Sequence, residues 1–176
     1  MKTDKKPEYM TVLSGDRMVL KTHGRIAFRG FIDALQAEVI EAQVIASEAG
    51  EGDFCGYLGE ILEYLRAIMA AEVKEKPLAP PALFGKNADE IHQLSHNTGG
   101  KLPPLPSYTQ GRLAARINTL RTRVREAELL GVRVFGPKET GPDDEREDII
   151  LALNRLSSAL WWLFCEYNRR KESRLN

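Results

Sequence analysis

The chain has 176 residues, of which 43% are hydrophobic and 28% charged, a balance typical of one soluble globular domain and not of a disordered chain. Its 25 Lys and Arg residues match its 25 Asp and Glu residues, which excludes a strong overall attraction to nucleic acid or to an anionic membrane. Cys55 and Cys165 form no CxxC pair, no signal-peptide pattern occurs, and Asn154 and Arg155 interrupt the longest apolar run. We therefore expect a cytoplasmic protein without a membrane span.

The first 24 residues read as an irregular arm, in which only VLSGDRMVLK resembles strand. Apolar residues at steps of three and four then predict a helix from about Arg25 to Ala49, ended by GEGD at residues 50–53. Asp53 can cap a second helix, whose apolar face includes Leu58, Ile61, Leu62 and Leu65. Pro77, Pro80 and Pro81 end the helical pattern.

A short helical piece, ADEIHQLSH, and an ordered loop, NTGGKLPPLP, are predicted next. The third long helix begins near Thr109 and carries a clean apolar stripe. The last begins near Glu145, with Asp143 or Asp144 as its cap. These segments predict an all-α fold: an up-down bundle of four to five helices, with an N-terminal arm (1–24) and a single helical domain (25–176).

Polar ridges lie beside the apolar stripes of three predicted helices. Each ridge follows steps of three or four residues: Arg25, Arg29 and Asp33; Asn118, Arg121, Arg125 and Glu128; Asn154, Ser157 and Trp161. Any one ridge can be a solvated flank with weak ion pairs. Three ridges in one bundle favour a ligand site.

The cations among these residues suit an oxyanion, because guanidinium groups match phosphate geometry. No GxxxxGK[ST] or GxGxxG motif is present, and no ExxH motif supports a di-iron centre. His92 and His96, one helical turn apart, are either ligands of a metal or hydrogen-bonding staples of a loop. We expect Cys55 and Cys165 to pack as small apolar side chains.

Several segments resemble the ATP:corrinoid adenosyltransferases over roughly residues 10–168. "ILALNRLSSALWWL" is similar to the family's LNRLS signature, and "LRTRVREAE" to its Arg-rich helix. "LKTHGRIAFRGFIDAL" resembles a pattern near the N-terminus of the propanediol-utilisation type. "DEIHQLSH" and REAE resemble the ethanolamine-utilisation branch most closely.

The resemblance implies a helical-bundle enzyme that transfers the 5′-deoxyadenosyl group of ATP to the cobalt of cob(I)alamin and releases triphosphate, with Mg²⁺ bound. It also implies a homo-oligomer, most often a trimer, with active sites between subunits, and cob(II)alamin held without its lower axial ligand. Association with a bacterial microcompartment is a further implication.

Residue roles follow from the same resemblance. ATP would be bound by Lys21, Arg25, Arg121, Arg125 and Asn154, and catalysis would depend on Arg125, Glu128 and Asn154. Glu128 would order an arginine or the Mg²⁺ shell. Trp161 and Asp33 would serve the corrinoid site, Trp161 by shielding the lower cobalt face and Asp33 by pairing with Arg125 of a neighbouring subunit. Arg155 would form an ion pair at the helix edge.

Three departures separate this sequence from other members. "YMTVLSGDRM" lacks the Thr-Gly-Asp-x-Gly phosphate loop of the propanediol type, and Leu129 stands where that type has arginine. The N-terminal His/Cys metal-binding extension of enteric members of the ethanolamine branch is absent, so dependence on a transition metal is not carried over. The missing phosphate loop favours the alternative of a non-catalytic corrinoid carrier. A third interpretation is a purely structural bundle whose charged faces are solvated.

Overall fold

The computed structural model describes residues 6–96, 105–137 and 145–175. The elements are a hairpin of β1 (Met10–Ser14) and β2 (Arg17–Leu20), then α1 (Gly24–Glu48), α2 (Gly52–Val73), α3 (Ala88–His96), the short 3₁₀ helix η1 (Tyr108–Gln110), α4 (Arg112–Phe135) and α5 (Glu147–Leu175). The all-α prediction is confirmed, with one small sheet in the arm where strand-like sequence was expected. The NTGGKLPP part of the predicted loop (97–104), Asp143 and Asp144 lie outside the described residues.

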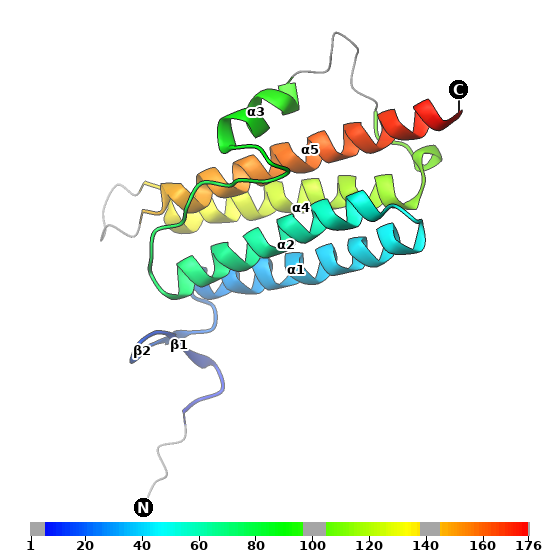
Figure 1. The fold of residues 1–176 in the computed structure, drawn as a ribbon. Coiled ribbons are helices and arrows are strands. Elements are labelled where there is room, and N and C mark those ends of the chain that lie inside the picture. Colours follow the sequence, from blue (N-terminus) through cyan, green and yellow to red (C-terminus); the bar gives the residue numbers. More distant parts are fainter. Residues whose placement is uncertain (1–5, 97–104, 138–144, 176) are drawn as a thin grey trace, which may run out of the picture.

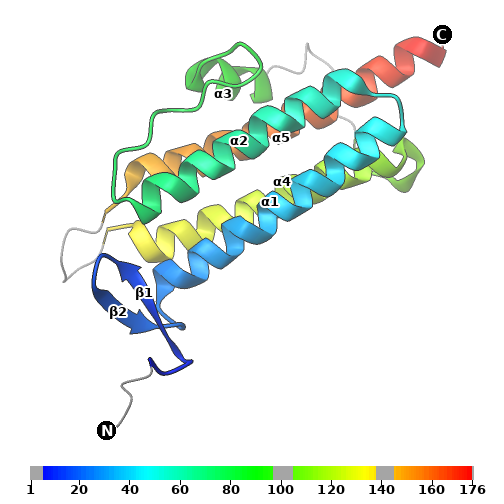
Figure 2. The ribbon, with the colours of Figure 1, turned by 60° about the horizontal axis from the view of Figure 1, so that its bottom comes forward.

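Four long helices, α1, α2, α4 and α5, bury one apolar core between them, and Figures 1 and 2 show how they are arranged. α1 packs against α2 and α4, and α5 packs against α4 and α2, so neighbours in the bundle are antiparallel. The connection that carries α3 runs back along the bundle, which leaves α2 and α4 parallel and diagonal to each other. α3 covers the outer side of α5.

Helix boundaries follow local chemistry. His23 caps α1, because its Nδ1 accepts a hydrogen bond from the Arg25 amide at 3.2 Å. Gly50, at φ +71°, allows the tight turn between α1 and α2. Asp53 lies in the first turn of α2 and does not cap it, because the N-cap position belongs to Glu51. Its negative charge there still interacts favourably with the positive end of the helix dipole.

α5 is the core helix of the bundle. By length and composition alone it could cross a membrane, since an 18-residue window reaches a mean hydropathy of 1.2 despite Asn154 and Arg155. The prediction that these two residues rule out such a segment is therefore wrong as a composition argument. Half of that window is buried against the rest of the chain, as in the core helix of a bundle.

The hairpin is tied to α1 and α2 by a buried charge cluster. The Glu72 carboxylate, fully buried, accepts hydrogen bonds from Arg25 Nε at 2.5 Å and from Arg29 Nε. Arg29 Nη2 also donates to the Leu13 carbonyl of β1 at 2.8 Å. Arg25 Nη1 donates to Glu75 at 2.7 Å. The position of the arm is thus fixed by two arginines of α1 that share one carboxylate of α2.

Asp148 closes the bundle at the start of α5. Its carboxylate accepts from the Leu78 amide at 2.8 Å and from Arg146 Nε and Nη2 at 2.9 Å each. Burial raises the pKa of Asp148, but the hydrogen bonds from Arg146 and Leu78 outweigh it and lower the pKa overall. A lowered pKa stabilises the fold above the ordinary pKa of aspartate, and this stabilisation is lost as the pH falls through the folded pKa.

We expect Asp148→Asn to lower the free energy of unfolding by about 1–3 kcal/mol at pH 7, because it removes a charged acceptor of several hydrogen bonds. The difference from wild type should begin to shrink below about pH 4, where the carboxylate of the unfolded chain protonates, and should shrink further as the pH falls through the lowered pKa of the folded state. Urea denaturation at pH 7 and pH 3 measures both values. Asp16→Asn, in the exposed hairpin turn, is the control and should match wild type. An equal difference at both pH values would contradict the linkage.

Candidate functional site

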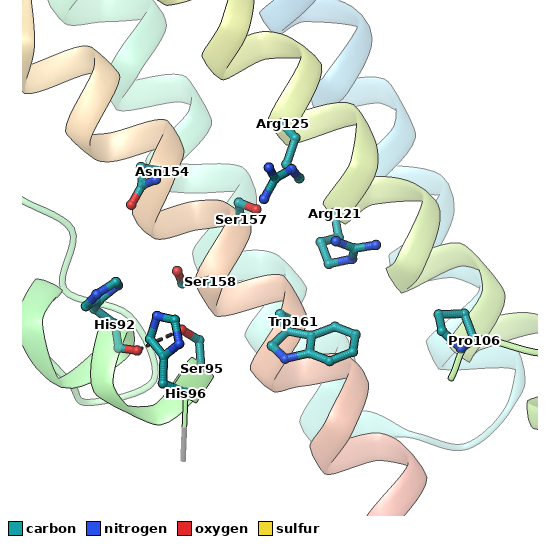
Figure 3. A pocket seen from close by; sticks show the side chains of 10 residues that line it. All are labelled: His92, Ser95, His96, Pro106, Arg121, Arg125, Asn154, Ser157, Ser158 and Trp161. Atoms are coloured by element: carbon teal, nitrogen blue, oxygen red, sulfur yellow. Dashed lines mark hydrogen bonds between the residues drawn. The ribbon is translucent and has the colours of Figure 1, made fainter. Parts of the chain in front are cut away.

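A pocket of about 470 Å³ lies between α3, α4 and α5 (Figure 3). α4 contributes Arg121 and Arg125. α5 contributes Asn154, Ser157, Ser158 and Trp161, and α3 contributes His92, Ser95 and His96. The ridges that the sequence placed on the third and last helices therefore meet in one cavity. Pro106 closes the end toward η1.

The two arginines of the pocket have no acidic partner within 4.0 Å among the described residues. Arg121 Nε donates to Asn118 Oδ1 at 3.2 Å, and its guanidinium carbon lies 5.4 Å from the centre of the Trp161 ring. Burial lowers the pKa of Arg121, and the positive charge of Arg125 lowers it further. Two unneutralised cations, one partly desolvated, give this pocket a strong preference for an anion.

A chain of hydrogen bonds joins α4 to α5 at the other end of the pocket. Asn154 Nδ2 donates to Glu128 Oε1 at 2.9 Å, and Arg155 Nη1 donates to Asn154 Oδ1 at 2.6 Å. Glu128 thus binds the amide, and it is not paired with either pocket arginine. The prediction that Arg155 forms an ion pair is wrong for the part of the chain that the structure describes, where no carboxylate lies within 4.0 Å of it.

Trp161 forms the aromatic part of the pocket. Its ring stacks on Phe164, with centroids 5.5 Å apart and an interplanar angle of 16°. Phe164 is fully buried, so the indole has a rigid support, while Trp161 itself is half-buried and lines the cavity. A flat apolar surface beside a guanidinium suits the edge or face of a large conjugated ligand.

The α3 wall holds two imidazoles. The rings of His92 and His96 have centroids 4.7 Å apart, and Ser95 Oγ donates to the His92 carbonyl at 2.7 Å. Within residues 6–96, 105–137 and 145–175, no cluster of three or more His, Cys, Asp or Glu side chains could hold a metal ion. The described residues therefore offer no third ligand for a metal at His92 and His96, and both side chains line the pocket.

The third predicted ridge, on α1, does not reach this pocket. Arg25 is 6% exposed, and its donors bind the side chain and carbonyl of Glu72 and the side chain of Glu75. The expectation that Arg25 binds a phosphate is corrected accordingly, since its charge is neutralised inside the fold. Lys21 and Asp33 are exposed, Lys21 just before α1 and Asp33 on its outer face.

Cys165 lies close to the pocket. Burial raises the pKa of its thiol, and Arg121 opposes this effect only in part. A thiol of raised pKa is a poor nucleophile at neutral pH. Cys55 and Cys165 are both half-buried and unpaired in disulfides, and both pack against the apolar core as expected.

Some pocket residues were not predicted. Ser158 and Ser95 carried a signal that could have found them, since each lies three or four residues from a predicted pocket residue or histidine. No signal in the sequence indicated the role of Glu72. An acidic residue at the end of a predicted helix gives no indication that two distant arginines surround it.

Comparison with known proteins identifies the family. The family model described as cobalamin adenosyltransferase matches residues 1–167. Over 160 residues the chain is 38% identical to the corrinoid adenosyltransferase EutT of Salmonella typhimurium strain LT2 and 35% identical to that of Escherichia coli strain K12. These matches cover 89% of this chain and 58% of each relative, so the chain spans little more than half the length of the curated relatives it matches.

Solved structures show the same fold. A phenylalanine-to-alanine variant of the PduO-type ATP:corrinoid adenosyltransferase from Lactobacillus reuteri, complexed with cobalamin and ATP, aligns with a TM-score of 0.70 at 17% identity, covering 93% of this chain and 91% of that one. An arginine-to-lysine variant of the same enzyme, complexed with ATP, aligns with a TM-score of 0.62 over the same shares of both chains. Fold and family model agree, and this chain belongs to the cobalamin adenosyltransferase family.

Proposed function

We propose that this chain transfers the 5′-deoxyadenosyl group of ATP to the cobalt of cob(I)alamin, forming adenosylcobalamin and releasing triphosphate. Family membership supports the reaction. The observation that carries the proposal onto these residues is the pairing, in one pocket, of two unneutralised guanidinium groups with an aromatic wall. A nucleotide triphosphate requires the guanidinium groups, and a corrin ring beside it suits the aromatic wall.

The reaction needs little covalent chemistry from the protein. The cobalt(I) electron pair of the substrate forms a Co–C bond to C5′ of ATP, and the C5′–O bond breaks with its electrons going to triphosphate. The tasks of the chain are to hold the two substrates in line and to stabilise the negative charge that grows on the leaving group. Arg121 and Arg125 perform the second task, and Asn154 orients the nucleotide.

Mg²⁺ would be held chiefly by the triphosphate, because this ion keeps most of its waters and binds one or two protein carboxylates at most. Glu128 is hydrogen-bonded to Asn154, and one of its oxygens is engaged by that amide. The other oxygen fits a water ligand of the ion. When bound, Mg²⁺ supplies positive charge to the leaving triphosphate.

The active unit in this proposal is a homo-oligomer, most simply a trimer. α1 exposes a stripe that contains Ile40 and Val44, which are 46% and 51% exposed, and α4 exposes Leu129 and Val132, which are 60% and 46% exposed. Asp33 lies on the outer face of α1, so a second copy could bring it to Arg125. The N-terminal arm, with Lys21, would then contact nucleotide in the neighbouring site.

We infer the pathway that uses the product from the curated relatives. We propose ethanolamine utilisation, in the cytoplasm and in association with a bacterial microcompartment.

An anaerobic assay tests the function. Purified protein receives cob(II)alamin, a reductant and MgATP, and the visible spectrum is followed for adenosylcobalamin while triphosphate is quantified. We expect the two products in equal amounts. A corrinoid spectral change without triphosphate would identify a carrier and reject the transferase. No spectral change and no ATP binding would leave a purely structural bundle.

Trp161→Ala tests the corrinoid wall. We expect the signal of four-coordinate cob(II)alamin, measured by magnetic circular dichroism with ATP present, to fall severalfold, because the shield against a lower ligand is lost. Trp161→Phe keeps an aromatic ring and should retain most of the signal. An undiminished signal in the alanine variant would remove Trp161 from the corrinoid site.

A further inference from the structure

Arg155 lies in the buried part of α5, and no described residue forms an ion pair with it. In the described residues its one hydrogen bond runs from Nη1 to Asn154 Oδ1, at 2.6 Å. Its Nε is buried and has no hydrogen-bond partner among these residues. Leaving a buried donor unsatisfied lowers stability, so the hydrogen bond to Asn154 explains Arg155 better than a contribution to the fold does.

The neighbours of Asn154 fix the orientation of its amide. An amide side chain has one acceptor oxygen and two N–H donors. Arg155 donates to the oxygen, and Glu128 accepts one N–H at 2.9 Å. Rotating the amide by half a turn would set its NH₂ against the guanidinium and its oxygen against the carboxylate. Both contacts would be repulsive, so a single orientation remains.

In this orientation the second N–H of Asn154 stays available to a ligand, while Arg155 occupies one of the two lone pairs of the amide oxygen. The pocket arginines are pure donors, since a guanidinium has no acceptor. We infer that Arg155 is a positioning residue that fixes the amide of Asn154, so that its second N–H joins Arg121 and Arg125 in donating hydrogen bonds to the oxygen atoms of the bound nucleotide. This inference rests on the proposed function and assigns Arg155 a role in it without direct contact with substrate.

A double-mutant cycle tests the inference with Arg155→Met, Asn154→Ala and the double variant. We expect kcat/KM for ATP to fall about 100-fold in Asn154→Ala and about 10-fold in Arg155→Met, as for lost hydrogen bonds to charged groups. The double variant should be no worse than Asn154→Ala, because Arg155 acts only through that amide. Arg155→Lys keeps a donor and should restore most of the loss.

A second readout does not depend on turnover. The side-chain NH₂ resonances of Asn154 are assigned in ¹⁵N spectra by their disappearance in Asn154→Ala. In Arg155→Met their hydrogen exchange should accelerate severalfold, because the amide can then rotate away from Glu128. Arg169→Met, on the exposed part of α5 where Arg169 pairs with Glu166, is the control and should behave as wild type.

The outcomes separate the inference from the function. If wild type makes adenosylcobalamin while the losses in kcat/KM are additive, or Arg155→Met matches wild type in turnover and amide exchange, the positioning role is wrong and the function stands. If wild type makes no adenosylcobalamin, the proposed function fails, and the amide exchange alone decides the positioning role. Thermal melting should show Arg155→Met folded, since it removes an unsatisfied buried donor.

Discussion

Arg125→Ala should lower kcat/KM for ATP by about 100- to 1,000-fold, the range found when one charge-stabilising donor is removed from an active site. Arg125 is exposed, lines the pocket, and makes no ion pair or hydrogen bond with another described residue, so nothing in the fold depends on it. Its guanidinium is available to the triphosphate, where negative charge increases during transfer. The anaerobic assay and a thermal melt, taken together, measure turnover and folding.

Two matched variants sharpen this prediction. Arg125→Lys keeps the charge and loses the planar fork, so we expect a loss of about tenfold. Arg133→Ala, two turns further along α4 and exposed, should keep wild-type turnover. The free energy of unfolding of all three variants should lie within about 0.5 kcal/mol of the wild-type value, as is usual for surface substitutions. Full turnover in a folded Arg125→Ala protein would remove this arginine from the mechanism.

Glu72→Ala should lower the free energy of unfolding by about 3–5 kcal/mol, because it leaves two guanidinium groups without their shared counter-ion. The Glu72 side chain is fully buried, and those of Arg25 and Arg29 are 7% and 16% exposed. The hairpin should also loosen, so amide hydrogen exchange in residues 10–20 should accelerate, since Arg29 no longer holds the Leu13 carbonyl.

Urea denaturation of Glu72→Ala, Glu63→Ala and a triple variant tests this prediction. Glu63→Ala breaks an exposed pair with Arg66 on the same helix and should cost less than about 1 kcal/mol. Replacing Glu72, Arg25 and Arg29 together by Met, Met and Leu should recover much of the lost stability, because apolar groups of similar volume often replace a buried ion pair without loss. A Glu72→Ala protein as stable as Glu63→Ala would show that the cluster does not hold the arm.

The helices could be predicted from the chain alone because each is amphipathic at the helical period. The apolar stripes of α1, α2 and α4 are the residues that become buried, and prolines and glycines mark the breaks between them. The hairpin was foreseen only as strand-like sequence. Its actual strands pair around Gly15, which adopts φ +52° in the turn.

The parts of the site on α4 and α5 could also be predicted from the sequence. Arg121, Arg125 and Glu128 share a helical face by spacing, and so do Asn154, Ser157 and Trp161, and these faces meet because α4 and α5 are adjacent and antiparallel. Resemblance to a known family then gave this seam its chemistry. α3 as a wall of the pocket followed from neither source, because a short helix after a long connection can pack on any face.

Spacing along one helix determined which residues of this protein share a face, since the rise and turn of an α-helix are fixed. It could not determine what each face meets. Arg25 and Arg125 look alike in the sequence, yet one is neutralised inside the bundle by Glu72 and Glu75, and the other stands free of carboxylates among the described residues. Only the packing of distant helices, which fixes the counter-ion and the solvent around each charge, decided which arginine holds the fold and which remains available to a ligand.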